Sequence, residues 1–218
     1  MSKKLHYNTV TPLLLSVLKQ LMDVKEFLAF RLVGGTDLSL LRGHRQSVDI
    51  DLFTDAVYGT VDFEAIDNYL RRTYPYVDTS NFKAIGMGTS YYVGENKDHC
   101  IKLDIFYTTD AFVWPIIEKS GIRMAALEEI IAMKLDVISR GGRKKDFWDI
   151  HELIDDYSFS EMLALHKQRY PYSHNAEEIR SKFIDFSQAD SDFDPICLKG
   201  KYWEVIKLDM IDFIKPMA

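Results

Sequence analysis

The stretch VGGTDLSLLRGHRQSVDIDLF, from Val33 to Phe53, decides the fold of this sequence. Its second half alternates apolar and polar residues over 47–53, which predicts a β-strand with Val48, Ile50 and Leu52 on one face. Successive side chains of a strand point to opposite faces, so Asp49 and Asp51 share the other face. Two carboxylates that face the same way are costly to bury unless a positive charge lies beside them. The stretch therefore raises the question of what these aspartates bind.

A third aspartate lies in a similar setting further along the chain. Residues 82–94 and 100–107 predict two strands joined by a turn at 95–98. The second of these strands reads IKLDIF and places Lys102 and Asp104 on one face. We expect Asp49, Asp51 and Asp104 to converge on a metal site. Oxygen ligands alone favour Mg²⁺ or Mn²⁺ over zinc, and a pair of such ions supports in-line attack at phosphorus.

The two glycines upstream strengthen this interpretation. Gly34 and Gly35 end a buried strand expected over 27–33, and a short helix is expected over 38–41. Glycines let backbone N–H groups approach phosphate oxygens closely, and the start of the helix adds positive charge. A D-x-D pair alone more often lies on a solvent-facing edge strand. The glycine turn and the third aspartate together favour a metal and phosphate site instead.

The remaining pattern predicts an α+β protein. The strands lie in the first half of the chain and the later segments are helical, so we expect a small mixed sheet with flanking helices and a helical C-terminal part. The expected division is residues 1–115, carrying the aspartates, and residues 116–218, completing the cleft. Helices are expected at 12–22, 63–74, 125–139, 145–157 and 202–213.

The charged residues Lys134, Asp146 and Asp149 of the helices expected at 125–139 and 145–157 each allow two interpretations. Lys134 lies at the margin of an apolar stripe, where it either presents its ammonium to a phosphate or is a surface lysine. Asp146 and Asp149 share a helix face and either position Lys134 or Arg140 or supply favourable charge to the start of the helix.

Cations near the glycine turn and near residue 143 also have two readings. Arg42, His44 and Arg45 either contact phosphates or an acceptor nucleic acid, or form a solvated loop. The basic stretch Arg140–Lys145, followed by Phe147 and Trp148, suits a single-stranded RNA end. Its first residue, Arg140, is explained equally well as favourable charge at the C-terminus of a helix. Because the net charge is −6, nucleic acid binding would depend on such a local patch.

Four segments together resemble a known family. They are VGGTDLSLLRGHRQSVDIDLF, IKLDIF, LEEIIAMKLDVISRGGRKKDFWDIHEL and FSQADSDFDPICLKGKYWEVIK. In this order they are similar to the AbiEii/AbiGii nucleotidyltransferase toxins, a branch of the DNA-polymerase-beta-like nucleotidyltransferase superfamily. These proteins are the toxin halves of type IV toxin–antitoxin systems. The resemblance runs from about residue 30 to residue 207.

The resemblance implies roles for individual residues. Gly34, Gly35 and Thr36 would hold the triphosphate, together with Lys102 and Arg45. Asp49 and Asp51 would ligate the metal, and Lys102 and Asp104 match a K-x-D element. Lys134 and Asp146 match the helical lysine and the K-D-x-x-D element. Gly35 stands where the wider superfamily often has serine, and Thr36 is the nearest hydroxyl.

The expected activity is transfer of NMP from an NTP to an acceptor hydroxyl, with Mg²⁺ or Mn²⁺ as cofactor. The resemblance implies RNA as acceptor, such as a tRNA 3′ end, and a cognate antitoxin. A protein or small-molecule hydroxyl, and a non-catalytic nucleotide-binding module, remain alternatives. A phosphohydrolase with Asp49 as nucleophile fits less well, since Phe53 stands where such loops carry threonine.

Cysteine content and the length of the apolar runs indicate the cellular compartment. The 218 residues contain two cysteines, Cys100 and Cys197, without metal-ligand spacing. Apolar runs stay shorter than the roughly 18 residues that a membrane helix needs. We expect a cytoplasmic protein that does not associate with membranes.

Overall fold

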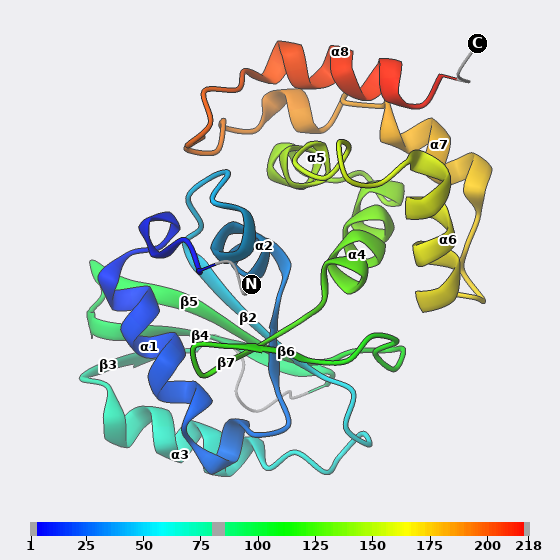
Figure 1. The fold of residues 1–218 in the computed structure, drawn as a ribbon. Coiled ribbons are helices and arrows are strands. Elements are labelled where there is room, and N and C mark those ends of the chain that lie inside the picture. Colours follow the sequence, from blue (N-terminus) through cyan, green and yellow to red (C-terminus); the bar gives the residue numbers. More distant parts are fainter. Residues whose placement is uncertain (1–3, 80–85, 216–218) are drawn as a thin grey trace.

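The computed structural model describes residues 4–79 and 86–215 (Figure 1). Within these residues one mixed sheet contains seven strands, in the order β3-β4-β5-β2-β1-β7-β6. The strands are β1 (Arg31–Val33), β2 (Asp49–Thr54), β3 (Tyr76–Asp78), β4 (Gly88–Asn96), β5 (His99–Tyr107), β6 (Ile117–Lys119) and β7 (Ile122–Met124). This arrangement confirms the expected α+β class.

Helices cover the sheet and extend beyond it. In Figure 1, α1 and α3 lie against the sheet, and α4 to α8 gather at its other side. The helices are α1 (Pro12–Met22), α2 (Gly34–Arg42), α3 (Phe63–Thr73), α4 (Leu127–Ser139), α5 (Lys144–His151), α6 (Phe159–Arg169), α7 (Ala176–Phe183) and α8 (Trp203–Phe213). The hydroxyl of Thr11 accepts from the backbone N–H of Leu14 and caps α1, as Thr-Pro predicts.

The alternation over β2 and β5 separates two surfaces. Ile50, Leu52, Leu103 and Ile105 are buried on the face that α1 and α3 cover. β2 and β5 are parallel, and their register places Asp51 beside Asp104 on the opposite face. The predicted facing of the aspartates is therefore confirmed. Val48 is the exception, since it lies before the strand and is 59% exposed.

Two hydrophobic cores share the chain. The first lies between the sheet and its covering helices and includes Ile122 and Met124. The second joins α4 to α8 and reaches back to Val33 and Leu38. A division after residue 115 would therefore cut β6 and β7 from the sheet, whereas the cores separate at about Ala125.

Three element boundaries differ from the expected ones. The strand expected over 27–33 is only β1, because Lys25–Phe27 form a 3₁₀ turn and Arg123 donates to the carbonyls of Phe27 and Phe30, which a ladder would otherwise use. The helix expected over 38–41 begins already at Gly34. The helix expected over 145–157 ends at His151, where the hydrogen bonds tighten to three-residue spacing. Residues 82–85 of the predicted strand 82–94 lie outside the described residues.

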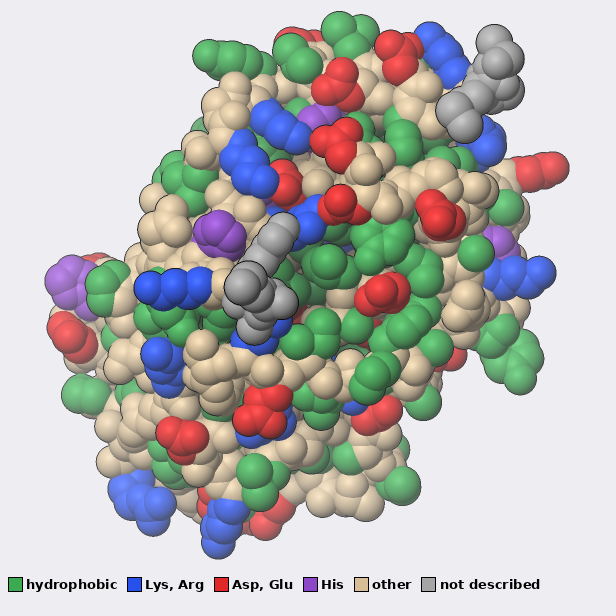
Figure 2. Space-filling model, in the orientation of Figure 1, with side chains coloured by type: hydrophobic (Ala, Val, Ile, Leu, Met, Phe, Trp, Pro, Cys, Tyr) green, Lys and Arg blue, Asp and Glu red, His purple; other side chains and the backbone are tan. Residues whose placement is uncertain are grey.

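The surface carries both signs of charge. On the face seen in Figure 2, lysines and arginines are interspersed with carboxylates and form no single basic field. Among residues 4–79 and 86–215, no helix combines the length and the apolar character that crossing a bilayer requires.

Substitution of Leu103 tests the first core. Leu103 is fully buried at the centre of β5, so Leu103→Ala is expected to lower the free energy of unfolding by about 2–5 kcal/mol. Urea denaturation measures this loss. The control is Leu28→Ala, because Leu28 is 62% exposed, and its effect should stay within about 0.5 kcal/mol. Equal effects of the two substitutions would contradict the assigned core.

Candidate active site

One side of the cleft is formed by β2 and the turn into α2. Asp49 and Asp51 project from β2 toward the start of α2. Gly34 has a positive φ of 72°, and a Cβ there would lie 2.9 Å from Oδ2 of Asp51. The glycine thus allows both the backbone turn and the close approach of the carboxylate.

Asp104 lies at the edge of this group. Its Oδ2 accepts a hydrogen bond from Nζ of Lys102 at 2.5 Å, and its Oδ1 accepts from Oγ of Ser90 at 2.5 Å. Ser90 comes from β4, which pairs with β5 in register with Asp104. The expected K-x-D element therefore forms an ion pair of its own beside the cleft.

The opposite side of the cleft contains a buried ammonium. Lys134 of α4 is 7% exposed, and its Nζ lies 2.6 Å from Oδ1 of Asp146 and 2.6 Å from Oδ2 of Asp149. The surface-lysine reading is therefore wrong, and the reading in which the two aspartates position Lys134 is confirmed. Asp149 lies in the second half of α5 and does not supply charge to the start of that helix. Oδ2 of Asp146 accepts from the backbone N–H of Arg143 at 3.0 Å and does supply it, so both readings hold for Asp146.

Asp149 continues this network toward the glycine turn. Its carboxylate accepts from Nε of Arg45 at 2.6 Å and from Nη2 at 2.8 Å, and it pairs with Nε2 of His44 at 2.8 Å. Nη1 of Arg45 donates to the carbonyl of Gln46 at 2.9 Å. Both His44 and Arg45 are buried, so the solvated-loop reading is wrong for them. As it stands, Arg45 holds Asp149, and its contact with a nucleotide stays a prediction.

Charge and burial shift the pKa values of the cleft aspartates in opposite directions. Burial, together with the nearby Asp104 and Asp49, raises the pKa of Asp51 to about 6. Burial also opposes ionisation of Asp149, yet the charges of Lys134 and Arg45 hold its pKa well below the ordinary value. The β2 side of the cleft thus has unbalanced negative charge, whereas the charges around Lys134 are compensated.

The cleft has a volume of about 410 Å³ and two chemically different ends. Near the aspartates its rim carries cations, and Nζ of Lys145 lies 3.5 Å from Oδ2 of Asp49. The cationic rim residues are Arg140, Arg143 and Lys145. The other end is lined by half-buried apolar and aromatic side chains, which are Phe53, Phe106, Met133, Val137 and Tyr170.

The structure brings together most of the site residues that the sequence predicts. Gly34, Gly35, Arg45, Asp49, Asp51, Lys134 and Asp146 line the cleft. Thr36, Lys102 and Asp104 lie outside its lining. The Thr36 hydroxyl contacts the carbonyl of Asp49 and the hydroxyl of Ser47, and the residue is buried. Thr36 therefore anchors the start of β2, and its expected contact with a triphosphate stays a prediction.

Sequence reasoning missed the aromatic end of the cleft. Phe53 and Phe106 continue the alternation of Asp49, Asp51 and Asp104 by one further step, so the strand period could have identified them. Their rings pack edge to face at 6.1 Å. Tyr170 carries no such signal, because α6 brings it to the cleft through tertiary packing.

The donor set is compatible with a divalent cation. Carboxylate oxygens of Asp49 and Asp51 face the cleft. Burial, with repulsion from Asp104 and Asp49, raises the pKa of Asp51, and a bound cation would relieve that repulsion. Within the described ranges, 4–79 and 86–215, no three His, Cys, Asp or Glu side chains are grouped closely enough to hold a metal as they stand. Asp104 is turned to Lys102 and Ser90 instead.

Comparisons with known proteins agree with this geometry. The family model described as nucleotidyl transferase AbiEii toxin, type IV TA system, matches residues 16–216. A candidate nucleotidyltransferase from Helicobacter pylori shares the fold with 21% identity and a TM-score of 0.57, over 90% of this chain and 88% of that chain. JHP933 from Helicobacter pylori is 21% identical with a TM-score of 0.57, over 90% of this chain and 85% of that chain. MenT4, a nucleotidyltransferase toxin from Mycobacterium tuberculosis H37Rv, is 14% identical with a TM-score of 0.52, over 91% of this chain and 84% of that chain. No curated protein sequence matches this chain.

The raised pKa of Asp51 predicts a pH-dependent effect on stability. The pKa of Asp51 is about 6 in the folded protein and 3.8 ordinarily. The folded state therefore holds the Asp51 proton more tightly than the unfolded state, and the free energy of unfolding falls as the pH rises from about 4 to 7. Asp51→Asn removes this loss. In EDTA, the variant should therefore gain about 2 kcal/mol on the unaltered protein between pH 4 and pH 7. Urea denaturation at both pH values measures it, and a pH-independent difference would contradict the assignment.

The ammonium of Lys134 is predicted to be essential for stability. Lys134→Met removes the ammonium between two buried carboxylates and leaves their negative charge only partly balanced, by Arg45 at Asp149 and by the exposed Arg143 at Asp146. It should cost about 3–5 kcal/mol of unfolding free energy. Lys134→Met/Asp146→Asn leaves the Asp149–Arg45 pair balanced and should recover part of the loss. Lys167→Met, at an exposed position of α6, is the control. Chemical denaturation measures all three, and a double variant no more stable than the single one would contradict the network.

Proposed function

This chain belongs to the AbiEii family of nucleotidyltransferase toxins, and on that premise we propose that it transfers NMP from an NTP to an acceptor in a metal-dependent reaction. The observation that carries the proposal is the cleft itself. It sets Asp49 and Asp51 beside the Gly34–Gly35 turn and opposite the ammonium groups of Lys134 and Lys145. Carboxylates on one side and cations on the other suit a metal-bound triphosphate.

The two carboxylates of β2 are the proposed metal ligands. Asp49 and Asp51 would hold Mg²⁺ or Mn²⁺, with Asp104 as a third ligand once its carboxylate turns from Lys102. A bound ion would neutralise phosphate charge and favour in-line attack at phosphorus. The backbone N–H groups at the start of α2 point to the triphosphate, and the helix start favours its negative charge.

Side chains of the other side complete the proposed reaction. Lys145 approaches Asp49 and would contact the phosphates, while Lys134 holds α5, which carries Lys145, through Asp146 and Asp149. The oxygen of the acceptor hydroxyl bonds to the α-phosphorus as the bond to pyrophosphate breaks, and pyrophosphate leaves. The hydroxyl proton passes to a carboxylate, for which Asp104 is the candidate at the edge of the group.

An RNA end is the proposed acceptor. Arg140, Arg143 and Lys145 line the cleft and leave a locally basic rim on a chain whose net charge is negative. Such a rim suits the backbone of a single-stranded end, including a tRNA 3′ end. The family is that of type IV toxin–antitoxin systems, so we propose growth arrest as the outcome and a cognate antitoxin as partner. Because an NTP and RNA are the proposed substrates, we propose the cytoplasm as the location of the activity.

The activity is tested by transfer of label from α-labelled NTPs. Purified protein with Mg²⁺, each of the four NTPs in turn and total bacterial RNA should label RNA. Asp49→Ala/Asp51→Ala should lower the rate by about a thousandfold or more, since it removes the charges that orient the triphosphate. Asp98→Ala, at an exposed turn, should retain full activity.

The other outcomes of this experiment are informative. Label on protein or on a small molecule would keep the chemistry and overturn the RNA acceptor. Label on RNA with the doubly substituted protein would overturn the roles of Asp49 and Asp51. NTP binding without transfer to RNA, protein or small molecules would favour the non-catalytic module.

A further inference from the structure

The segment 108–114 follows β5 directly and is held by side chains from other elements. It begins with Thr108 and Thr109, which line the cleft. Arg169, the last residue of α6, donates from Nη1 to the carbonyls of Asp110 at 2.6 Å and Ala111 at 2.8 Å. Its Nη2 donates to Oγ1 of Thr108 at 2.7 Å. A single guanidinium thus fixes the first half of the segment.

Glu129 of α4 fixes the second half. Its Oε2 accepts from the backbone N–H groups of Val113 at 3.0 Å and Trp114 at 3.1 Å. Its Oε1 forms an ion pair with Nε of Arg169, and both side chains are completely buried. Irregular segments need partners for their backbone groups, and here two charged side chains supply them.

Stability alone does not explain this pair. Moving two charges out of water costs several kcal/mol per ion, so a buried pair contributes little net stability compared with apolar residues of the same size. A buried pair whose other polar atoms bond to backbone groups instead restricts those groups to one arrangement. The Glu129–Arg169 pair therefore orders the segment.

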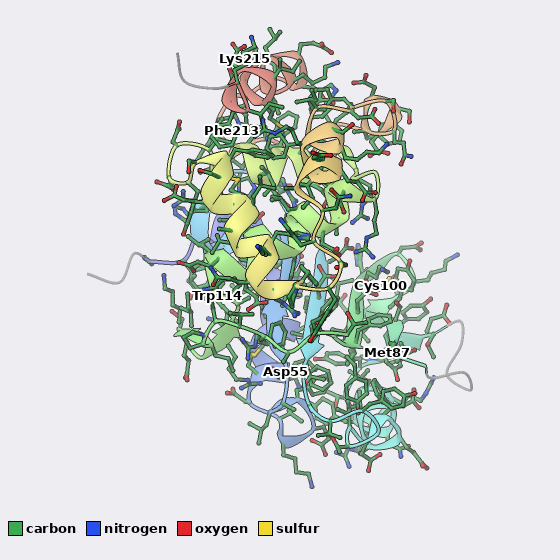
Figure 3. All side chains as sticks on the ribbon, turned by 90° about the vertical axis from the view of Figure 1, so that its right-hand side faces the viewer. Asp55, Met87, Cys100, Trp114, Phe213 and Lys215 are labelled. Carbon is green, nitrogen blue, oxygen red and sulfur yellow. The ribbon has the colours of Figure 1, made fainter. Side chains whose placement is uncertain are left out.

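The sheet holds the same segment from its other side. Nη1 of Arg31 donates to the carbonyl of Trp114 at 3.0 Å, and its guanidinium lies 3.8 Å from the centre of the Phe112 ring. Oδ2 of Asp55 accepts from the N–H of Phe112 at 3.1 Å. In Figure 3, Trp114 and Asp55 lie below the lower end of α6. The segment is thus fixed between the sheet and helices α4 and α6.

This segment lies at the apolar end of the cleft. Phe53 and Phe106 stand two residues beyond Asp51 and Asp104, which is about 7 Å along the strands. Tyr170, next to Arg169, lines the same end, and the Arg169 guanidinium lies 4.9 Å from the centre of its ring. In a nucleotide the ribose separates the phosphates from the base. A triphosphate at the glycine turn would therefore place its nucleoside part against these rings.

We propose that the Glu129–Arg169 pair positions the part of the cleft wall that contacts the nucleoside of the NTP, and so controls nucleotide affinity without contacting the triphosphate. The inference rests on the proposed function, since it assumes an NTP in the cleft. Glu129 and Arg169 are positioning residues, because they act through Thr108, Thr109 and Tyr170. The base stacks on the aromatic wall that they hold.

Binding measurements separate this role from a general structural one. Isothermal titration compares two probes in the presence of Mg²⁺, the NTP that the unaltered protein binds most tightly and inorganic tripolyphosphate. Glu129→Gln/Arg169→Met removes both charges, leaves no unpaired buried charge and keeps the side-chain volumes similar. It should weaken NTP binding about tenfold, by loss of stacking, and change tripolyphosphate binding by less than about twofold. Arg169→Lys, which keeps the charge but not the planar fork, should show the same pattern.

The control is Arg180→Met. Arg180 of α7 donates to the carbonyl of Ile214 and lies 4.8 Å from the centre of the Phe159 ring, away from the residues that line the cleft. It should leave both affinities unchanged. Equal losses for the two probes, or no loss for either, would overturn the positioning role. If the unaltered protein binds tripolyphosphate but no NTP, the proposed function itself fails, and this inference fails with it.

Discussion

The arrangement of the cleft depends on the buried ammonium of Lys134. It lies between Asp146 and Asp149 of α5, and Asp149 in turn holds Arg45 and His44 beside the glycine turn. Two carboxylates are thus compensated by one lysine and one arginine in a site nearly closed to water. Removing any one of these charges leaves the buried network with an uncompensated charge. The network therefore fixes α4 and α5 relative to the turn between α2 and β2.

The register of β2 and β5 divides the sheet side of the cleft into a charged part and an aromatic part. Because the strands are parallel and in step, Asp51 lies beside Asp104 and Phe53 beside Phe106 on one face. A charged surface is followed, two residues later, by an aromatic one. A nucleoside triphosphate has the same sequence of a charged part and an aromatic part, which supports the proposed orientation of the substrate.

Buried ion pairs hold α4 at two places along its length. Lys134 pairs with α5 near the phosphate end of the cleft, and Glu129 pairs with Arg169 of α6 near the apolar end. The sheet and the helical part have separate hydrophobic cores, yet each contributes one side of the cleft. The second core reaches Val33 and Leu38, so apolar packing joins the two parts, and the Asp149–Arg45 pair adds a polar contact between them beside the cleft.

The sequence by itself determined the elements with strong periodicity. The alternation over β2 and β5 predicted the facing of Asp49, Asp51 and Asp104, and the glycines predicted the turn, because side-chain direction in a strand follows from its period of two. Only the tertiary structure decided which charges meet. Arg45 and Asp149 are far apart in the chain. The alternative for Arg45 was a solvated loop and that for Asp149 was favourable charge at the start of its helix, while Tyr170 had no local signal at all. Such contacts depend on how separate elements pack, and local sequence patterns do not encode that packing.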